Sequence, residues 1–386
     1  MQKKNVLVAA LVALALAACG ESPTEMTPET EPSLSSGSSG LRGAAGRFIV
    51  TLRDRNDPAG VAREYGVQPD FVYTRVLNGF AGAISDAARQ GLMRDSRIAR
   101  IEPDGIATVV TTQSGATWGL DRVDQRSVPL STTYNYTRTG AGVNAYIIDT
   151  GIRFAHLEFG GRATSGYDAV DGGTADDCNG HGTHVVGTVG GTRYGIAKKA
   201  NLIGVRVLDC AGSGFLSGVI AGIDWVAANH VKPAVANLSL GSGANASVDD
   251  AVRHLIASGV TTVVAAGNSN SDACRFSPAR VTEAMTIGAS NKNDYRPSWS
   301  NYGACLDWFA PGAGITSAWY TGNSATGTIS GTSMASPHTA GVAALYLQLN
   351  PGASPATVRT ALYNNTTKRV IRGSYTANNH LLFSNY

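Results

Sequence analysis

The chain has 386 residues, of which 15% are charged and 46 are glycine, and its formal net charge is +3. This composition is typical of a tightly packed globular protein and excludes an intrinsically disordered one. Lysine and arginine are dispersed along the chain without a run of five, so the sequence lacks the clusters of basic residues that are typical of proteins that bind nucleic acid or anionic membranes. The length allows two compact units, or one large domain with an appendage.

Residues 1–19 have the pattern of an export signal. Lys3 and Lys4 precede an apolar stretch, and small residues follow it. The apolar stretch is too short and wrongly flanked for a membrane span. The sequence LAAC, which ends at Cys19, also fits a bacterial lipoprotein box, in which Cys19 is acylated and becomes the new amino terminus. Ordinary cleavage near the same place is the alternative. Both interpretations predict an exported protein, and acylation would anchor the precursor through Cys19.

Residues 20–45 are rich in Pro, Ser, Thr, Glu and Gly, which predicts a disordered linker. Residues 46–110 then alternate between strand and helix patterns. The expected elements are a strand at 47–54, a helix at 58–67, two strands within 71–85, a helix at 86–96 and a strand from 98. This order predicts a small α+β domain of the ferredoxin-like type. It contains no cysteine and no cluster of His, Asp or Glu, so we assign it no chemistry.

Residues 111–386 predict a second, larger domain. Apolar strands are expected at 143–149, 201–209, 234–241 and 260–267, and helices at 181–191, 214–230 and 247–259. Continuous apolar strands that alternate with amphipathic helices predict an α/β fold with a doubly wound, mostly parallel sheet and helices on both faces. Ligands of such sheets bind at the carboxyl ends of the strands.

Four polar residues stand at those strand ends or at helix starts. Asp149 and Asn268 end strands, whereas His181 and Ser333 begin helical patterns. Taken singly, each has a structural explanation as a turn residue, a buried histidine or a helix cap. Taken together, they supply a nucleophile, a base, a carboxylate that orients the base, and a donor for an oxyanion. The set therefore predicts acyl transfer with Ser333 as the nucleophile.

Apart from Cys19, the chain has four cysteines, at positions 178, 210, 274 and 305. An even number in an exported chain predicts disulfides, but four cysteines permit three pairings and the spacing does not choose among them. The alternative is a metal site formed by Cys178, His181 and His184. This alternative is disfavoured, because no second cysteine lies within two to four residues of Cys178.

Four blocks, YIIDTGI, GHGTHVVG, AAGNS and GTSMASPH, occur in this order. Because of these four blocks, residues 111–386 resemble the subtilisin-like serine peptidases, or subtilases. The stretches WGLDRVDQR, VRVLDC, PAVANLSLG and SPARVTEAMTIGAS are similar to the proteinase K branch, and within it to the aqualysin type. Residues 46–110 resemble the subtilase propeptide, which implies an intramolecular chaperone and temporary inhibitor that is cut off near Val110-Thr111.

The resemblance implies a role for each candidate residue. Asp149 would be the orienting acid, His181 the general base, Ser333 the nucleophile and Asn268 the oxyanion donor. His184 would be structural, and His156 and His338 would lie outside the site. The resemblance also implies the disulfides Cys178–Cys210 and Cys274–Cys305.

Substrate contacts follow from the same resemblance. An extended peptide would add as a strand between Gly212-Ser213-Gly214 and Ser239-Leu240-Gly241. The primary specificity pocket would be lined by Leu240, Gly241, Ala265, Ala266 and Gly267. Its small walls without a charged floor imply broad cleavage after apolar or aromatic residues.

Calcium is the implied cofactor, at one or two structural sites. One site would use the Asp307 carboxylate with the carbonyls of Thr282 and Ala284. The second would use Asp121, Asp124, Gln125, Ser131 and Thr133, whose oxygen ligands suit calcium. The alternative for Asp121 and Asp124 is that they are ordinary surface acids.

The sequence as a whole predicts an exported serine endopeptidase made as a zymogen that processes itself, with proteins and peptides as substrates and its own propeptide as partner. We expect a monomeric mature form and no binding to nucleic acid. An α/β-hydrolase esterase is disfavoured, because that fold places Ser before Asp and His in the chain. A catalytically inactive subtilase-like binding protein is the remaining alternative.

Overall fold

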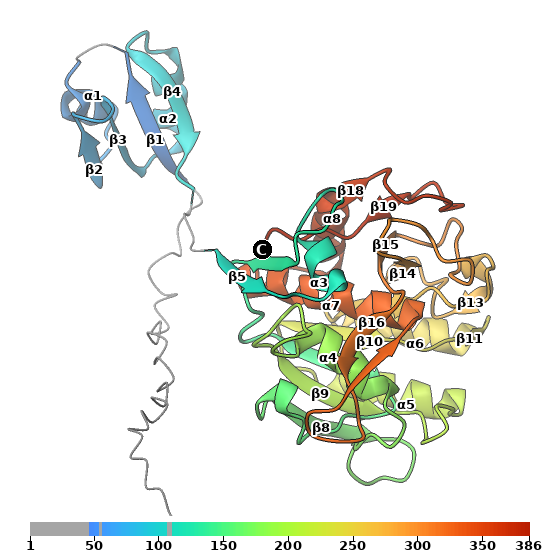
Figure 1. The fold of residues 1–386 in the computed structure, drawn as a ribbon. Helices are drawn as coiled ribbons and strands as arrows, with labels where there is room; N and C mark the ends of the chain where they lie inside the picture. The colour runs from blue at the N-terminus through green and yellow to red at the C-terminus, as the bar shows by residue number, and fades with distance from the viewer. Residues whose placement is uncertain (1–45, 54–55, 106–109) are drawn as a thin grey trace, which may run out of the picture. The chain divides into compact units, whose positions relative to one another are not determined.

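The structure is a computed structural model that describes residues 46–53, 56–105 and 110–386. The predicted export signal, Cys19 and the linker to residue 45 lie outside the described residues. The chain divides into two compact units, Met1–Ala107 and Thr108–Tyr386 (Figure 1). In the described ranges, no helix combines the length and apolar character needed to cross a membrane.

The smaller unit is a four-stranded sheet with two helices. Its elements are β1 (Arg47–Leu52), α1 (Pro58–Glu64), β2 (Phe71–Tyr73), β3 (Gly79–Ala83), α2 (Asp86–Arg94) and β4 (Ile98–Pro103). The strand order is β2-β3-β1-β4, with all neighbours antiparallel. Asp57 and Ser85 cap the two helices by accepting hydrogen bonds from main-chain N–H groups of the first turn. Val50, Phe80 and Leu92 are buried between the sheet and the helices.

The larger unit is built on a nine-stranded sheet. Its order is β18-β19-β15-β14-β12-β10-β7-β9-β8, and the run from β19 to β8 is parallel throughout. The strands are β7 (Asn144–Asp149), β8 (Ala163–Asp168), β9 (Asn201–Arg206), β10 (Ala234–Leu238), β12 (Thr261–Ala265), β14 (Met285–Ser290), β15 (Trp308–Pro311), β18 (Thr367–Lys368) and β19 (His380–Leu381). The predicted mostly parallel, doubly wound fold is confirmed.

Helices and short hairpins complete this unit. The helices are α3 (Trp118–Val123), α4 (His181–Gly190), α5 (Leu216–Asn229), α6 (Ala246–Ala257), α7 (Thr332–Leu349) and α8 (Pro355–Asn365), with 3-10 turns η1 (Leu157–Phe159) and η2 (Ala273–Arg275). The two-stranded pairs are β5 (Thr111–Ser114) with β6 (Thr133–Tyr136), β11 (Ser242–Gly243) with β13 (Phe276–Ser277), and β16 (Ile315–Ala318) with β17 (Thr326–Ile329).

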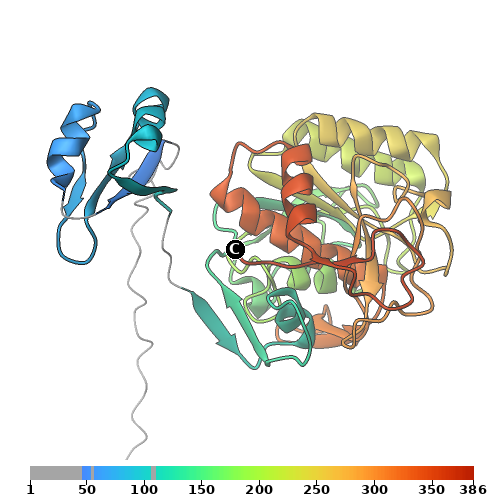
Figure 2. The same ribbon diagram turned by 90° about the horizontal axis from the view of Figure 1, so that it is seen from above.

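Both faces of the large sheet are buried. Along β7, Ala145 and Ile147 enter the core shared with α4 and α7, whereas Tyr146 and Ile148 enter the core shared with α5 and α6. Side chains of a strand alternate between faces, so helices on both sides require the unbroken apolar run that the sequence shows. Figure 2 shows the larger unit from above, with helices on both sides of its sheet.

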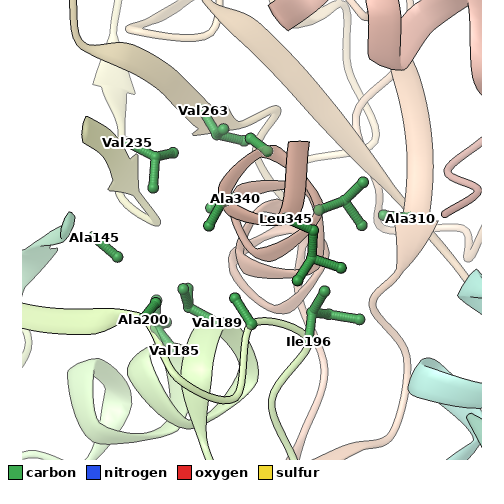
Figure 3. Packing of buried hydrophobic residues seen from close by; sticks show 14 of the residues in the cluster. Ala145, Val185, Val189, Ile196, Ala200, Val235, Val263, Ala310, Ala340 and Leu345 are labelled. Atoms are coloured by element: carbon green, nitrogen blue, oxygen red, sulfur yellow. The ribbon is translucent and has the colours of Figure 1, made fainter. Parts of the chain in front are cut away.

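Helix α7 is the centre of the larger core. Figure 3 shows Ala340 and Leu345 of this helix, with Val185 and Val189 of α4 and Val235 of β10 close to it. Small residues in α7 allow this close approach: a methyl group added at Gly341 would lie 2.5 Å from Ile196 Cβ. The starting turn of α7, which carries Ser333, is therefore fixed by a tightly packed helix behind it.

Candidate active site

The carboxyl ends of three neighbouring strands build the site. Asp149 is the last residue of β7, Ser239 directly follows β10, and Asn268 lies just beyond β12. These strands are adjacent and parallel in the order β12-β10-β7, so their carboxyl ends share one edge of the sheet. The sheet topology therefore brings together residues that are far apart in the sequence.

Asp149 and His181 form a close pair. Asp149 Oδ1 lies 2.7 Å from His181 Nδ1, and the aspartate side chain is 0% exposed whereas the imidazole is 26% exposed. A carboxylate only accepts hydrogen bonds, so Nδ1 carries the proton and Nε2 is left as a base. The structure thus contains the orienting contact predicted from the sequence.

The environment tunes His181 for proton transfer. Burial lowers the pKa of His181, but the charge and hydrogen bond of Asp149, together with the charge of Asp177, raise it, and the net shift is upward. The two carboxylates therefore stabilise the imidazolium that forms when the base accepts a proton.

Asp177 is a supporting residue that the sequence reasoning missed. Its Oδ1 accepts hydrogen bonds from Thr150 Oγ1 and Gly180 N, both at 2.9 Å. Its Oδ2 accepts from Thr183 N at 2.9 Å and from Thr183 Oγ1 at 2.6 Å. A buried carboxylate at the amino end of α4 fixes the first turn that carries His181 and complements the helix dipole. Its position just before the helical pattern is the only sequence signal for this role.

Ser333 is the second residue of α7. Its hydroxyl donates to the main-chain oxygen of Ser239 at 3.0 Å. Across the described part of the chain, no hydrogen bond joins Ser333 Oγ to His181, so the predicted contact between nucleophile and base is not made in this rotamer. Such contacts are often long in substrate-free enzymes, and rotation about Cα–Cβ to another staggered rotamer redirects the hydroxyl.

Asn268 is held by its amide oxygen, and its amide nitrogen has no hydrogen-bond partner among the residues that the structure describes. Its Oδ1 accepts from Thr332 N at 2.8 Å and from Thr332 Oγ1 at 2.9 Å. A methyl group added at Gly331 would lie 3.4 Å from Asn268 Nδ2 and 3.6 Å from Ser333 N, so both potential donors border the same small space. This is the arrangement of an oxyanion hole, and Thr332 is a further residue that sequence reasoning missed.

A buried network ties the end of β10 to α7. Ser239 Oγ donates to the main-chain oxygen of Ser333 at 2.8 Å and lies 2.9 Å from Ser336 Oγ. Asn237 Nδ2 donates to Ser239 Oγ at 2.8 Å. The strand predicted to bind substrate and the turn that carries the nucleophile are therefore one connected unit.

Two adjoining clefts contain all the residues predicted to bind substrate. One has a volume of about 520 Å³ and is lined by His181 and by residues 212–214 and 239–241, with apolar additions from Leu216, Val219 and Val248. The other has a volume of about 360 Å³ and is lined by residues 239–243 and 265–269, with Phe276, Ala279 and Ser333. No charged side chain lines the second cleft in the described residues.

The disulfides are those implied by the resemblance. Cys178 bonds to Cys210 and Cys274 to Cys305, with Cα–Cα distances of 4.9 Å and 5.3 Å. The alternative metal site at Cys178 is wrong, because its sulfur is in a disulfide. The described ranges contain no cluster of three His, Cys, Asp or Glu side chains that could hold a metal ion.

The other histidines near the site are structural. His184 Nε2 bonds the main-chain oxygen of Ile315 at 2.9 Å, and His338 Nδ1 bonds that of Met334 at 2.8 Å. Burial lowers the pKa of both side chains to about 4, so neither titrates near neutral pH. His156 lies against the Ala325 carbonyl at 2.8 Å.

The residues around Asp307 do not fit the calcium site expected there. Arg359 Nε donates to Asp307 Oδ1 at 3.1 Å, and Thr286 N donates to Oδ2 at 2.8 Å. The guanidinium group is a cation already paired with the carboxylate that was expected to bind calcium together with the carbonyls of Thr282 and Ala284, and its charge would repel a second cation there. The prediction at Asp307 is therefore not carried further.

The residues around Asp124 do fit a cation. Asp124 Oδ2 accepts from Asn135 N at 2.7 Å, but its Oδ1 is buried without a partner. Burial, together with the charge of Asp121, raises the pKa of Asp124. Asp121 Oδ1 accepts from Ser131 Oγ at 2.9 Å, which in turn lies 2.8 Å from Thr133 Oγ1. A hard cation would satisfy the unpaired oxygen and offset the repulsion between the two carboxylates.

An imidazole whose Nδ1 is held by a buried carboxylate has Nε2 available to move protons. Together with a serine at a helix start and two N–H donors beside it, this geometry defines a serine hydrolase of the acyl-transfer class.

Comparison with known proteins narrows the class. The model of the Subtilase family (Peptidase_S8) matches residues 140–382. The chain is 50% identical to the "Extracellular serine proteinase" of Thermus sp. (strain Rt41A), across 97% of this chain and 98% of that protein. It is also 50% identical to the "Alkaline serine exoprotease A" of Vibrio alginolyticus, across 83% of this chain and 61% of that protein. The chain therefore belongs to the subtilase family of serine endopeptidases.

A solved structure agrees with this assignment. The crystal structure of a cold adapted subtilisin-like serine proteinase is 54% identical, has a TM-score of 0.70, and matches 71% of this chain and 100% of that one.

Proposed function

We propose that this subtilase is a secreted endopeptidase that uses Asp149, His181, Ser333 and Asn268 in the roles implied by the sequence. The observation that carries the proposal is the 2.7 Å contact between the buried Asp149 carboxylate and His181 Nδ1, at the sheet edge that also holds the other two residues. A helix start suits the nucleophile, because the amino end of α7 leaves the Ser333 N–H free of an intrahelical partner.

The reaction follows from these positions. Ser333 Oγ leaves the Ser239 carbonyl, transfers its proton to His181 Nε2 and bonds to the substrate carbonyl carbon. The carbonyl oxygen becomes an oxyanion that accepts from Asn268 Nδ2 and Ser333 N. His181 then donates the proton to the leaving amine as the peptide C–N bond breaks. Water hydrolyses the acyl-enzyme by the same steps, and the proton returns to Ser333.

The two clefts suggest how a substrate binds. An extended peptide would add as a strand between residues 212–214 and 239–241, which line the larger cleft. The smaller cleft has no charged lining residue, so we propose broad specificity with a preference for apolar and aromatic side chains before the cleaved bond. A peptide-library cleavage profile tests this, and a preference for Lys, Arg, Asp or Glu there would contradict it.

We further propose that residues 46–110 are a propeptide, removed by cleavage near Val110-Thr111. Val110 is 57% exposed and Thr111 is the first residue of β5, so a cut there would leave the fold of the larger unit intact. Mass spectrometry of the secreted protein tests this in a host without other proteases. The precursor of Ser333→Ala should stay uncut, and trimming of this variant at the same bond would exclude self-processing. Acylation of Cys19 stays a prediction from the sequence.

Calcium is proposed at Asp121 and Asp124 only, with Gln125, Ser131 and Thr133 as further oxygen ligands. The bound ion would join α3 to β6 and so stabilise the start of the larger unit. Chelation should lower the melting temperature of the mature enzyme, whereas mature Asp124→Asn should respond little to the chelator. An equal response in both proteins would contradict this site.

Hydrolysis of casein separates the proposed enzyme from an inactive binding protein. Mature wild type should degrade casein. Ser333→Ala, freed of residues 46–110 by an added protease that is then removed, should not. If both proteins were inert, the catalytic proposal would fail.

A further inference from the structure

The loop that carries Asn268 lies against a second segment. We name residues 266–271 the oxyanion loop and residues 299–302 the support segment. Four main-chain hydrogen bonds join residues 267–273 to the support segment: Asn301 N to Gly267 O at 2.9 Å, Asn270 N to Trp299 O at 2.9 Å, Tyr302 N to Ser271 O at 3.1 Å and Ala273 N to Tyr302 O at 2.8 Å. The support segment, which follows β14 in the chain, therefore lies along the oxyanion loop and is hydrogen-bonded to it.

Asn301 reaches from the support segment into the oxyanion loop. Its Nδ2 donates to the main-chain oxygen of Ala266 at 2.8 Å. Its Oδ1 accepts from Ser269 N and from Ser271 N, both at 3.0 Å. The Asn301 side chain is fully buried, and its three hydrogen bonds hold the main chain on both sides of Asn268.

The shape of the loop is matched to this side chain. Gly267 has φ +100°, a conformation that L side chains rarely adopt, and a Cβ there would lie 2.5 Å from Asn301 Nδ2. Only a planar amide of this length offers a donor to Ala266 and an acceptor to the two serine N–H groups. An aspartate at 301 would place an oxygen against the Ala266 carbonyl and leave that buried acceptor unpaired.

Another link already keeps the two segments together. The disulfide Cys274–Cys305 joins the chain just after the oxyanion loop to the chain just after the support segment. Arg296 Nη1 also donates to Asn270 Oδ1 at 3.0 Å. The Asn301 amide is therefore not needed merely to hold the loop on the protein, and its hydrogen bonds define the position of the loop more finely.

We infer that Asn301 is a positioning residue for the oxyanion hole: it fixes the main chain around Asn268, so that Asn268 Nδ2 keeps its aim at the developing oxyanion. The inference rests on the proposed role of Asn268. Thr332 orients the Asn268 side chain, whereas Asn301 orients the peptide units that carry it. Misplacing a donor by a fraction of an ångström weakens stabilisation of the transition state more than binding of the ground state.

The test measures kcat and KM of the mature enzyme on a peptide p-nitroanilide, per active site titrated with a serine-directed inhibitor. Asn301→Ala should lower kcat by about 10- to 100-fold and change KM by less than about threefold, because the interaction acts in the transition state. Ser300→Ala is the matched control. Its hydroxyl is also buried in the support segment, where it accepts from Ala289 N at 3.0 Å and donates to the main-chain oxygen of Asn301 at 3.1 Å. In the described residues it makes no hydrogen bond to the oxyanion loop and leaves the Asn301 amide in place, so kcat should stay unchanged.

A double-mutant comparison shows whether the effect passes through Asn268. In an Asn268→Ala background, Asn301→Ala should lower kcat by less than about threefold, because the donor it positions is already absent. An equal loss in both backgrounds, or a loss confined to KM, would overturn the inference. If Asn268→Ala alone left kcat unchanged, the proposed role of Asn268 would fail, and the inference with it.

A second variant serves as a control for the case that Asn301→Ala fails to fold. If Asn301→Ala does not mature, Asn301→Ser, which keeps an acceptor oxygen, is measured in its place with the same expectation of a kcat effect. If neither variant gave titratable enzyme while Ser300→Ala did, Asn301 would be a folding residue and the inference would be overturned.

Discussion

The two halves of the proposed active site are held by different kinds of interaction. In the acid–base half, the charged Asp149 carboxylate binds His181, and a second buried carboxylate, Asp177, holds the helix start below it. In the oxyanion half, neutral hydrogen bonds from Thr332 orient Asn268. The first half must stabilise a charge that appears on an imidazole, so carboxylates suit it. The second must present a donor whose aim is independent of pH, so neutral groups suit it.

Removing the charge in the acid–base half should have the largest effect. We expect Asp149→Asn to lower kcat about 10⁴-fold, because the imidazole loses the partner that fixes its tautomer. Steady-state kinetics on titrated enzyme provide the measurement, with the variant precursor matured by a trace of wild-type enzyme that is then removed. A loss of tenfold or less would mean that Asp149 is not the orienting acid.

Removing the oxyanion donor should have the next largest effect. Asn268→Ala should lower kcat about 10²- to 10³-fold with little change in KM, since the donor acts only when charge develops on the oxygen. The pH dependence of its kcat/KM should match that of wild type, because no titrating group is altered. If the fall of kcat/KM at low pH had a different midpoint in Asn268→Ala than in wild type, the oxyanion half would affect the pKa of His181 and the two halves would not be independent.

Weakening the support of Asn268 should have a smaller effect. Thr332→Val keeps the size of the side chain and the main-chain N–H but removes the hydroxyl, which donates to Asn268 Oδ1 at 2.9 Å and accepts from Gly267 N at 3.0 Å. We expect kcat to fall about 30-fold, because two neutral hydrogen bonds of about 1 kcal/mol each are lost. Thr332→Ser, which restores the hydroxyl, should recover most of the activity, and failure of this rescue would contradict the assigned role.

The smallest expected effect is a shift in the pH at which kcat/KM of the wild-type enzyme falls on acidification. The base must be neutral to accept a proton, and the pKa of His181 is raised above the ordinary value of about 6.5 for a histidine side chain, because the two carboxylates outweigh burial. The kcat/KM of the free enzyme should therefore fall on acidification with a midpoint above 6.5. A midpoint below that value would mean that burial outweighs the two carboxylates.

The parts that the sequence predicted are those whose signals are local. The unbroken apolar run of β7 ends in Asp149, and the same pattern precedes Asn268, so a parallel sheet alone brings both to one edge. The helix starts at His181 and Ser333 were also recognisable from the chain.

The parts that were missed depend on contacts between distant residues. Asn301 acts on a loop 30 residues or more away in sequence, and its neighbours in the chain give no sign of this. Asp307 shows the same limit in the opposite direction. The family resemblance implied calcium there, but Arg359, 52 residues further on, forms an ion pair with the carboxylate. Strand β15 has only four residues, too few for a periodic pattern to identify.

The most direct test of the catalytic account is covalent labelling of the nucleophile. Mature enzyme is treated with a fluorophosphonate, digested and examined by mass spectrometry, with Asp149→Asn in parallel. The account predicts one adduct per molecule, on Ser333, formed rapidly in wild type and far more slowly in Asp149→Asn. An adduct on another serine, or equal rates in the two proteins, would contradict it.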